Sequence, residues 1–486
     1  MRRLVALSAL GFLIVVGVLM MRAARLTSKQ IAVGPATPVA LDRDALAARL
    51  AQAVRFQTVS QQDATNADGA QLLALHQLLR EQFPLVHAQL KRETVNTYSL
   101  LYTWEGTEPQ RPPLLLLSHL DVVPIEPGTE THWTQPPFEG RIADGFVWGR
   151  GTLDDKCGVL GALEAVEALL RQGVRPRASI YLAFGHDEEL GGDHGARELA
   201  AVLQARGVRP ELVLDEGGAV TQGLLPGIAG PVAVIGIAEK GSVSLELTAH
   251  VEGGHSSAPP PHTAVGILSA AIAALEQNQM PMHLGGPTRH FFEYVGAEMP
   301  LSYRMALANL WLFQPVLDRY LVAVPAINAT LRTTTAATMI SGGVKENVLP
   351  ASARAVVNFR ILPGDTVASV IEHARHAVND PRVDVQPLAG EREPSAESPV
   401  DVPAFATLQR SISQVFPGVI VSPYLTIGGT DARHYAGLSA NIYRFTPITG
   451  DSTTLARIHG TDERLGVADY ERSVRFYIQL IQNAAL

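Results

Sequence analysis

The chain has 486 residues, of which 47% are hydrophobic, so it is long enough for a large core and for two or more domains. A net charge of -8 without a long basic run gives no electrostatic support for nucleic-acid binding, and we expect no nucleic-acid partner. The single cysteine, Cys157, excludes an intrachain disulfide bond and is interpreted as a small buried residue.

The first predicted element is an apolar segment. Residues 4–21 contain no charged side chain and are flanked by arginines. An apolar run of about 18 residues can just span a bilayer, whereas the apolar core of a cleaved signal peptide is usually shorter. We therefore predict that residues 1–30 form an N-terminal membrane anchor, with the catalytic body outside the cytoplasm, in a periplasm or lumen. If the segment is a signal peptide that is cleaved, the protein is secreted instead.

Beyond a linker at residues 27–39, strand and helix patterns alternate. Residues 114–117, 179–184 and 212–214 are short apolar runs typical of buried strands, and residues 159–170 carry a helical stripe between the first two. This alternation predicts an α/β fold with a mainly parallel sheet sandwiched by helices. In such sheets, functional residues gather at the carboxyl ends of the strands.

The pattern changes near Lys240. Residues 242–251 and 352–362 alternate apolar and polar side chains, as half-exposed strands do, and residues 264–275 between them look helical. This predicts an inserted α+β domain between the two parts of a catalytic domain. The predicted boundaries are 40–238 for the first catalytic segment, 239–388 for the inserted domain and 389–486 for the second catalytic segment.

His119 and Asp121 follow the first apolar strand. Residues i and i+2 of an extended strand point to the same face, so Asp121 can hold one ring nitrogen of His119 and leave the other for a metal ion. A histidine that only satisfies its own hydrogen bonds at a strand end is the alternative. Further acidic motifs in the chain favour the metal.

Pairs of acidic residues follow a glycine-rich turn and two later strands. In an extended backbone the side chains of Glu188 and Glu189 diverge, so one can ligate a metal while the other reaches a water molecule on it. Zinc accepts imidazole and carboxylate ligands, and two cations about 3.5–4 Å apart need a shared anionic bridge. Two dications would also balance acids that would otherwise repel one another or become protonated. The motif residues are Asp154 and Asp155, Glu188 and Glu189, Asp215 and Glu216, and His459.

Seven motifs in order resemble those of a known family. They are SHLDVVP, GRGTLDDK, DEELGG, LDEGG, GGHSSAPP, IGGTDAR and HGTDE. Together they resemble the co-catalytic zinc metallopeptidase family of aminoacylase, carboxypeptidase S and succinyl-diaminopimelate desuccinylase. The closest resemblance is to the branch of carboxypeptidase S and the N-fatty-acyl-amino-acid synthase/hydrolases, and it covers nearly everything after residue 40.

The resemblance implies two Zn2+ ions per subunit, with Co2+ or Mn2+ as substitutes. Asp154 would bridge the ions and Asp121 would orient His119. Glu188 would be the general base that takes a proton from water and passes it to the leaving amine. The other implied ligands are His119, Glu189, His459 and either Asp215 or Glu216, because family members differ in which acid of that pair they use.

Three more residues are implied in substrate binding. His255 matches a lid histidine that stabilises the oxyanion and comes from the partner subunit in dimeric members, so a homodimer through the lid is expected; an ordinary loop histidine is the alternative. Arg433 could clamp a substrate carboxylate with its planar guanidinium, unless it forms an ordinary surface ion pair. Asn347 would line the substrate cleft, unless it only forms a turn.

These features predict a zinc-dependent hydrolase of amide bonds, of carboxypeptidase or aminoacylase type. It would cleave C-terminal amino acids from peptides or hydrolyse N-acyl amino acids, since Arg433 favours substrates with a free carboxylate. Aminopeptidase or dipeptidase specificity within the family is one alternative. A two-metal phosphoesterase is another, although the residue order does not suit it. The third is a membrane-tethered binding protein without catalysis. The complete set of metal ligands and a general base argue against it.

Overall fold

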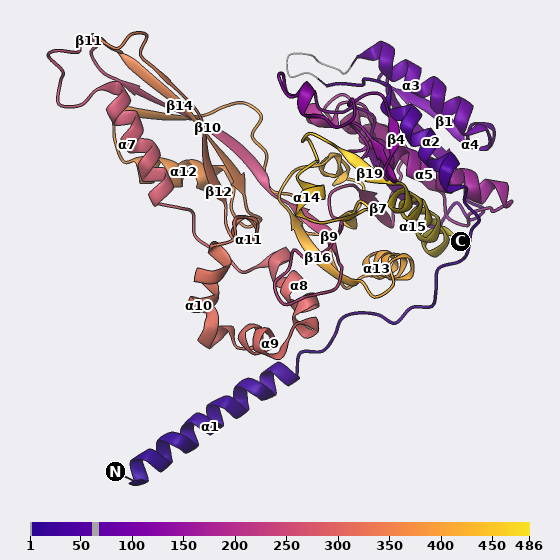
Figure 1. Cartoon of the computed structure of the whole chain (residues 1–486), viewed down its shortest axis with the longest axis horizontal. Helices are drawn as coiled ribbons and strands as arrows, with labels where there is room; N and C mark the ends of the chain where they lie inside the picture. Colours follow the sequence, from indigo (N-terminus) through magenta and orange to yellow (C-terminus); the bar gives the residue numbers. More distant parts are fainter. Residues whose placement is uncertain (1, 61–67) are drawn as a thin grey trace.

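A computed structural model describes residues 2–60 and 68–486 (Figure 1). Its main element is a sheet of ten described strands in the order β1-β2-β6-β3-β7-β17-β9-β8-β18, with β16 paired to β9. At its centre β6, β3, β7 and β17 are parallel, and β1 and β2 form an antiparallel edge. The strands are β1 (Lys91–Val95), β2 (Ser99–Trp104), β3 (Leu114–His119), β6 (Ile180–Gly185), β7 (Leu212–Asp215), β8 (Val220–Thr221), β9 (Val232–Glu239), β16 (Ile420–Thr426), β17 (Ile442–Arg444) and β18 (Thr449–Gly450).

Helices cover both faces of this sheet because its central strands are apolar on both sides. Leu114 and Leu116 of β3 belong to a core that includes residues of α2, α5, α13 and α15. Leu115 and Leu117 belong to a second core with α6. The predicted α/β fold with a mainly parallel sheet between helices is confirmed. The helices are α2 (Arg43–Val54), α5 (Lys156–Arg171), α6 (Ala196–Ala205), α13 (Pro403–Val415) and α15 (Val467–Ala485), with α3 (Gly69–Gln82) and α4 (Pro84–Gln89) near the β1 edge.

A separate four-stranded sheet, in the order β12-β14-β10-β15, lies in the inserted segment, and we call it, with its helices, the lid. Alternate residues of β10 pack with α7 and α12 into a core of their own, which explains the alternating sequence pattern. The two-stranded sheet of β11 and β13 lies at the outer end of the lid (Figure 1). The lid elements are β10 (Gly241–His250), β11 (Gly254–His255), α7 (Ala264–Gln277), β12 (Thr334–Gly342), β13 (Val348–Leu349), β14 (Ser352–Ile361), α12 (Val367–Val378) and β15 (Val383–Pro387).

The described residues of four helices inside the inserted segment are not part of the lid core. α8 contacts β16 of the large sheet, and Val295 and Met299 share a core with Val232 and Val234 of β9. The sequence pattern did not predict this, because it assigned the whole insertion to the lid. The helices are α8 (Gly286–Val295), α9 (Leu301–Ala308), α10 (Leu310–Val322) and α11 (Pro325–Ala329).

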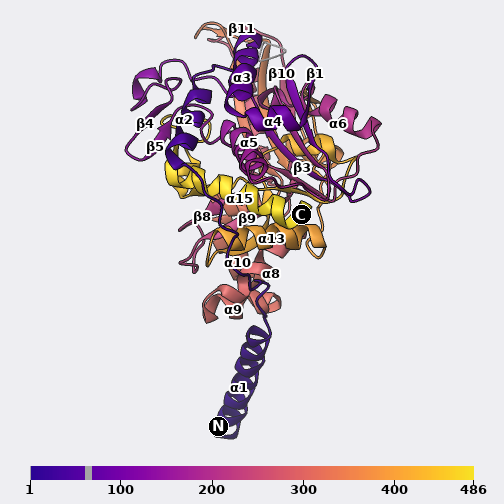
Figure 2. The same cartoon turned by 90° about the vertical axis from the view of Figure 1, so that its right-hand side faces the viewer.

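The N-terminal helix α1 (Arg2–Ala24) extends away from both sheets, and its C-terminal end packs against α9 (Figures 1 and 2). Among the described helices, α1 alone is long and apolar enough to cross a membrane, a property that signal sequences share.

Candidate metal centre

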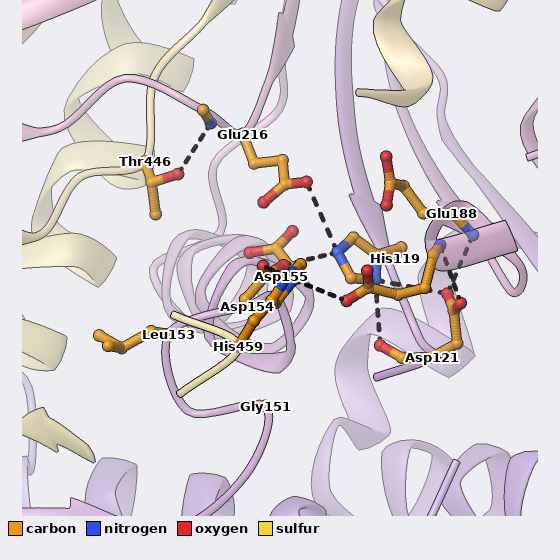
Figure 3. Close-up of polar contacts among 12 residues, drawn as sticks. His119, Asp121, Gly151, Leu153, Asp154, Asp155, Glu188, Glu216, Thr446 and His459 are labelled. Atoms are coloured by element: carbon orange, nitrogen blue, oxygen red, sulfur yellow. Dashed lines mark hydrogen bonds and ion pairs between the residues drawn. The ribbon is translucent and has the colours of Figure 1, made fainter. Parts of the chain in front are cut away.

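Neighbouring strand ends bring the predicted site residues together (Figure 3). His119 is the last residue of β3, Glu188 follows β6, and Glu216 follows β7. Because β6, β3 and β7 are adjacent and parallel, their carboxyl ends lie side by side. One local expectation is wrong: Glu188 and Glu189 lie in a 3-10 turn, η2 (Glu188–Leu190), and not in extended backbone.

His119 is held from one side and presents its other nitrogen to the acids. Its side chain is 1% exposed. Nδ1 lies 3.0 Å from the backbone oxygen of Asp121 and 3.3 Å from its Oδ1. Nε2 lies 2.9 Å from Oδ1 of Asp154 and 3.5 Å from Oε1 of Glu216. The ring is thus oriented as a metal ligand would be, with a carboxylate behind it.

Asp154 lies between the two histidines. It precedes the N-terminus of α5, and its peptide bond to Asp155 is cis. Its Oδ1 faces His119, and its Oδ2 lies 3.0 Å from Nε2 of His459, which follows α14 (Ser452–Leu455). Oε1 of Glu189 is 3.3 Å from the same nitrogen of His459. A carboxylate in this position can bridge two cations.

The ligand atoms form three groups in which all atoms lie within 4.8 Å of one another. Two of these groups share Asp154, and two share His119. The groups are His119, Asp154 and Glu216; His119, Glu188 and Glu189; and Asp154, Glu189 and His459.

The charge of these groups fits bound cations. Burial, together with neighbouring carboxylates, raises the pKa of Glu188 and of Glu216 well above the ordinary value. Burial disfavours ionised Asp154 as well, but hydrogen bonds from His119 and His459 hold its pKa below the usual range. Buried acids gathered around two imidazoles are the donor set of a divalent metal site, and the chain's own histidines balance only part of their charge.

The structure separates the two acids at the end of β7, of which Asp215 is its last residue and Glu216 the next. Glu216 faces His119, whereas Asp215 points toward a different loop. Oδ2 of Asp215 accepts a hydrogen bond from the backbone N–H of Ala432 at 2.6 Å, and its Oδ1 accepts one from the N–H of Glu216 at 3.0 Å. Asp215 belongs to none of the ligand groups among the described residues.

Asp121 connects the histidine to the turn that carries the glutamates. Its Oδ1 accepts a hydrogen bond from the N–H of Glu188 at 3.1 Å, and its Oδ2 accepts one from the N–H of Glu189 at 3.2 Å. The hydroxyl of Ser60 donates to the same Oδ2 at 2.6 Å. One fully buried carboxylate therefore positions His119 and the η2 turn together.

Glu463 is a supporting residue that the sequence reasoning left without a role, although it closes the HGTDE motif. It is fully buried and accepts hydrogen bonds from the backbone N–H groups of Gly151 at 2.9 Å and Leu153 at 2.8 Å. The guanidinium of Arg150 donates to Glu463 at 2.7 Å and to the carbonyl of His459 at 3.2 Å. These contacts join the loop before Asp154 to the loop of His459.

The three predicted substrate-binding residues lie outside the ligand groups. His255 and Asn347 lie near each other at the outer end of the lid, because His255 pairs with Val348 and the carbonyl of Asn347 accepts a hydrogen bond from the N–H of Ser256. His255 is exposed, and it belongs to none of the ligand groups in the part of the chain that the structure describes. Arg433 is closer, because it donates hydrogen bonds to the carbonyls of Thr430 and of Gly191, the residue after η2.

A mostly parallel sheet with imidazole and carboxylate groups at its strand ends, beside an inserted lid, is the architecture of a metal-dependent hydrolase. The chain belongs to peptidase family M20/M25/M40, whose model matches residues 115–483. This confirms the family that the sequence motifs predicted.

Individual relatives agree with this assignment. Probable carboxypeptidase S-like 2 from Dictyostelium discoideum is 41% identical, over 97% of this chain and 92% of that protein. The N-fatty-acyl-amino acid synthase/hydrolase PM20D1 from Homo sapiens is 42% identical, over 84% of this chain and 81% of its own length. Carboxypeptidase S from Saccharomyces cerevisiae is 33% identical, over 90% of this chain and 83% of that protein.

Among solved structures, the M20 family metallo-carboxypeptidase Sso-CP2 from Sulfolobus solfataricus has the same fold. It superposes with a TM-score of 0.64 at 15% identity, covering 90% of this chain and 98% of its own.

Proposed function

We propose that this chain is a zinc-dependent hydrolase that cleaves the amide bond of N-acyl amino acids or of the C-terminal residue of peptides. The relatives named carboxypeptidase S and N-fatty-acyl-amino acid synthase/hydrolase support this substrate class. The observation that carries the proposal is the position of Asp154, whose two carboxylate oxygens face two different histidines.

We assign one zinc ion to His119, Asp154 and Glu216, and the other to Asp154, Glu189 and His459. When bound, such a pair of cations supplies Lewis acidity and lowers the pKa of a coordinated water molecule. In this assignment Asp121 acts through His119, and Asp215 acts only as a structural acceptor.

Glu188 is the general base in this proposal. Its carboxylate lies in one group with His119 and Glu189, yet it is the acid of that group that the two-ion assignment leaves unused. It can therefore take a proton from the attacking water and return it to the amine nitrogen that leaves. Burial raises the pKa of Glu188, which favours its protonated form between the two transfers.

Substrate recognition divides between the two parts of the molecule. Arg433, next to the η2 turn, would bind the free carboxylate of the substrate. His255 and Asn347 would complete the site of a partner subunit in a homodimer formed through the lid, since they lie together at the lid's outer end. We also propose that α1 is a membrane anchor with the catalytic body outside the cytoplasm.

Replacing Glu188 with Gln tests the chemistry. The purified full chain, loaded with zinc, would be assayed against N-acyl amino acids and dipeptides. We expect Glu188→Gln to keep its zinc and its fold but to lose about 10²–10⁴-fold in kcat. Glu198→Gln, at an exposed glutamate of α6, is the matched control and should retain full turnover. Undiminished turnover in Glu188→Gln would remove Glu188 from the mechanism, and an inactive wild type would contradict the proposed activity itself.

A further inference from the structure

We propose that the helices α9 and α10 form a second membrane contact beside α1, lying in the interface of the same bilayer. This inference rests on the anchorage proposed above and not on the proposed chemistry. Both views of the molecule place α9 directly beside the C-terminal end of α1, with α10 next to α9 (Figures 1 and 2).

The packing of α1 sets the depth of α9. The apolar window of α1, Leu7–Ala24, is 18 residues long. At about 1.5 Å per residue it is just long enough for a hydrocarbon core of about 30 Å. Its last turns must therefore lie at one edge of that core. Leu19 is 6% exposed and Ala23 is fully buried, and both are covered by the protein itself.

Polar side chains from the α9 region contact the backbone at that end of α1. The guanidinium of Arg304 donates to the carbonyl of Ala23 at 3.1 Å, and the amide of Asn309 donates to the carbonyl of Leu19 at 3.2 Å. The carbonyl of Ala23 belongs to the last turn of α1, where carbonyls lack the usual partner within the helix, and in a bilayer such groups must be satisfied by protein. α9 is thus attached to the part of α1 that leaves the membrane, and it lies at that depth.

The composition of the attached segment suits this depth. Residues 305–317 contain no charged side chain, and between residues 299 and 330 the charged residues are Arg304, Asp318 and Arg319. Large apolar side chains are nevertheless exposed there. Trp311 is 61% exposed, Leu301 52% and Leu312 42%. An exposed tryptophan among exposed leucines, beside the end of a membrane span, suits the membrane–water interface, where tryptophan is enriched.

A cavity of about 110 Å³, lined mostly by apolar side chains, lies between α8, α9 and α10. Its residues are distinct from the metal ligands, so it is not the reaction site. It is lined by Met282, Leu284, Phe292, Leu307, Leu310, Gln314, Leu321 and Leu331. Most of the side chains that line this cavity are thus apolar, as are the large side chains exposed on the same helices.

Tryptophan fluorescence tests the proposal in the full chain. Three of the four tryptophans, Trp104, Trp133 and Trp148, are at most 8% exposed, so Trp311 reports on this face. The full chain would be reconstituted in vesicles of phosphatidylcholine with and without bromine atoms near the carbonyl end of one acyl chain. We expect brominated lipid to quench a blue-shifted emission, and we expect Trp311→Phe to abolish that quenching.

Two leucine variants provide a matched comparison. Leu312→Glu should reduce the quenching of Trp311, whereas Leu73→Glu, at a leucine of α3 that is 52% exposed, should leave it unchanged. Hydrolysis of a water-soluble substrate should be unaffected in both variants, which shows that they fold.

Three results would overturn the proposal. The first is a Trp311 emission typical of water. The second is a blue shift without bromine quenching, which would indicate contact with a second protein copy. The third is release of the full chain from the vesicles by an alkaline wash. The last result would contradict the anchor while leaving the proposed hydrolase intact, because hydrolysis is measured separately.

Discussion

Replacing Asp121 with Asn removes the charge that connects His119 to the η2 turn while preserving the size of the side chain. In the native protein each carboxylate oxygen of Asp121 accepts a hydrogen bond from a backbone N–H, one from Glu188 and the other from Glu189. An asparagine has only one oxygen. Whichever way the amide is oriented, its NH2 group therefore faces one of these two N–H donors.

The expected cost follows from this geometry. At least one buried N–H loses its charged acceptor, and such a hydrogen bond contributes about 1.5–3 kcal/mol. The metal-free protein should lose stability by about that amount. Because His119 also loses the carboxylate behind its ring, zinc affinity should fall by about 10–100-fold. Burial opposes ionisation of Asp121, but the hydrogen bonds with His119, Ser60 and Glu189 lower its pKa, so the native group is ionised.

Chemical denaturation of the chelator-treated protein measures the stability, and competition with a chromophoric chelator measures zinc affinity. Glu164→Gln is the control. It weakens a buried ion pair between Glu164 of α5 and Arg49 of α2, neither of which belongs to a ligand group, so it should destabilise the fold without changing zinc affinity. If Asp121→Asn and Glu164→Gln reduce stability alike and neither changes zinc affinity, Asp121 does not position a metal ligand.

Three further predictions concern pH, the ligand pair and substrate choice. Hydrogen bonds to Asp154 and Glu189 raise the pKa of His459 to about 10 in the metal-free protein, so zinc must displace a proton and its affinity should rise from about pH 6 to about pH 9; a flat profile in chelator competition would contradict this. The same raised pKa stabilises the metal-free fold below about pH 6.5, and this contribution is lost as the pH rises toward 10. Glu216→Gln should lower zinc affinity, measured in the same way, by more than tenfold, whereas Asp215→Asn should mainly lower the denaturation midpoint; equal effects on affinity would refute the assignment of Glu216. Arg433→Ala should raise KM for substrates with a free carboxylate and leave KM for their amidated analogues unchanged, and equal changes for both would remove the proposed clamp.

Much of the fold was predictable because local patterns determine it. The leucine run at 114–117 is apolar on both sides, and the structure buries it from both sides. Ligands at strand ends could be expected to converge because adjacent parallel strands end at the same edge. The lid strands β10 and β14 were predicted from their alternation to within one residue at each end.

Other features depend on contacts between distant parts of the chain and could not be predicted. Whether Asp215 or Glu216 faces the ligands depends on the backbone of Ala432, which holds Asp215 on the other side. The role of Glu463 depends on the loop of Gly151, whose φ of +92° favours glycine. The attachment of α8 to β16 likewise joins segments that the sequence pattern assigned to different domains.

Diffraction from crystals of the zinc-loaded full chain, recorded at the zinc absorption edge, tests the two-ion centre most directly. The proposed assignment predicts two anomalous peaks on either side of the Asp154 carboxylate, one beside His119 and Glu216 and the other beside Glu189 and His459. A single peak, or peaks that do not touch Asp154, would contradict it.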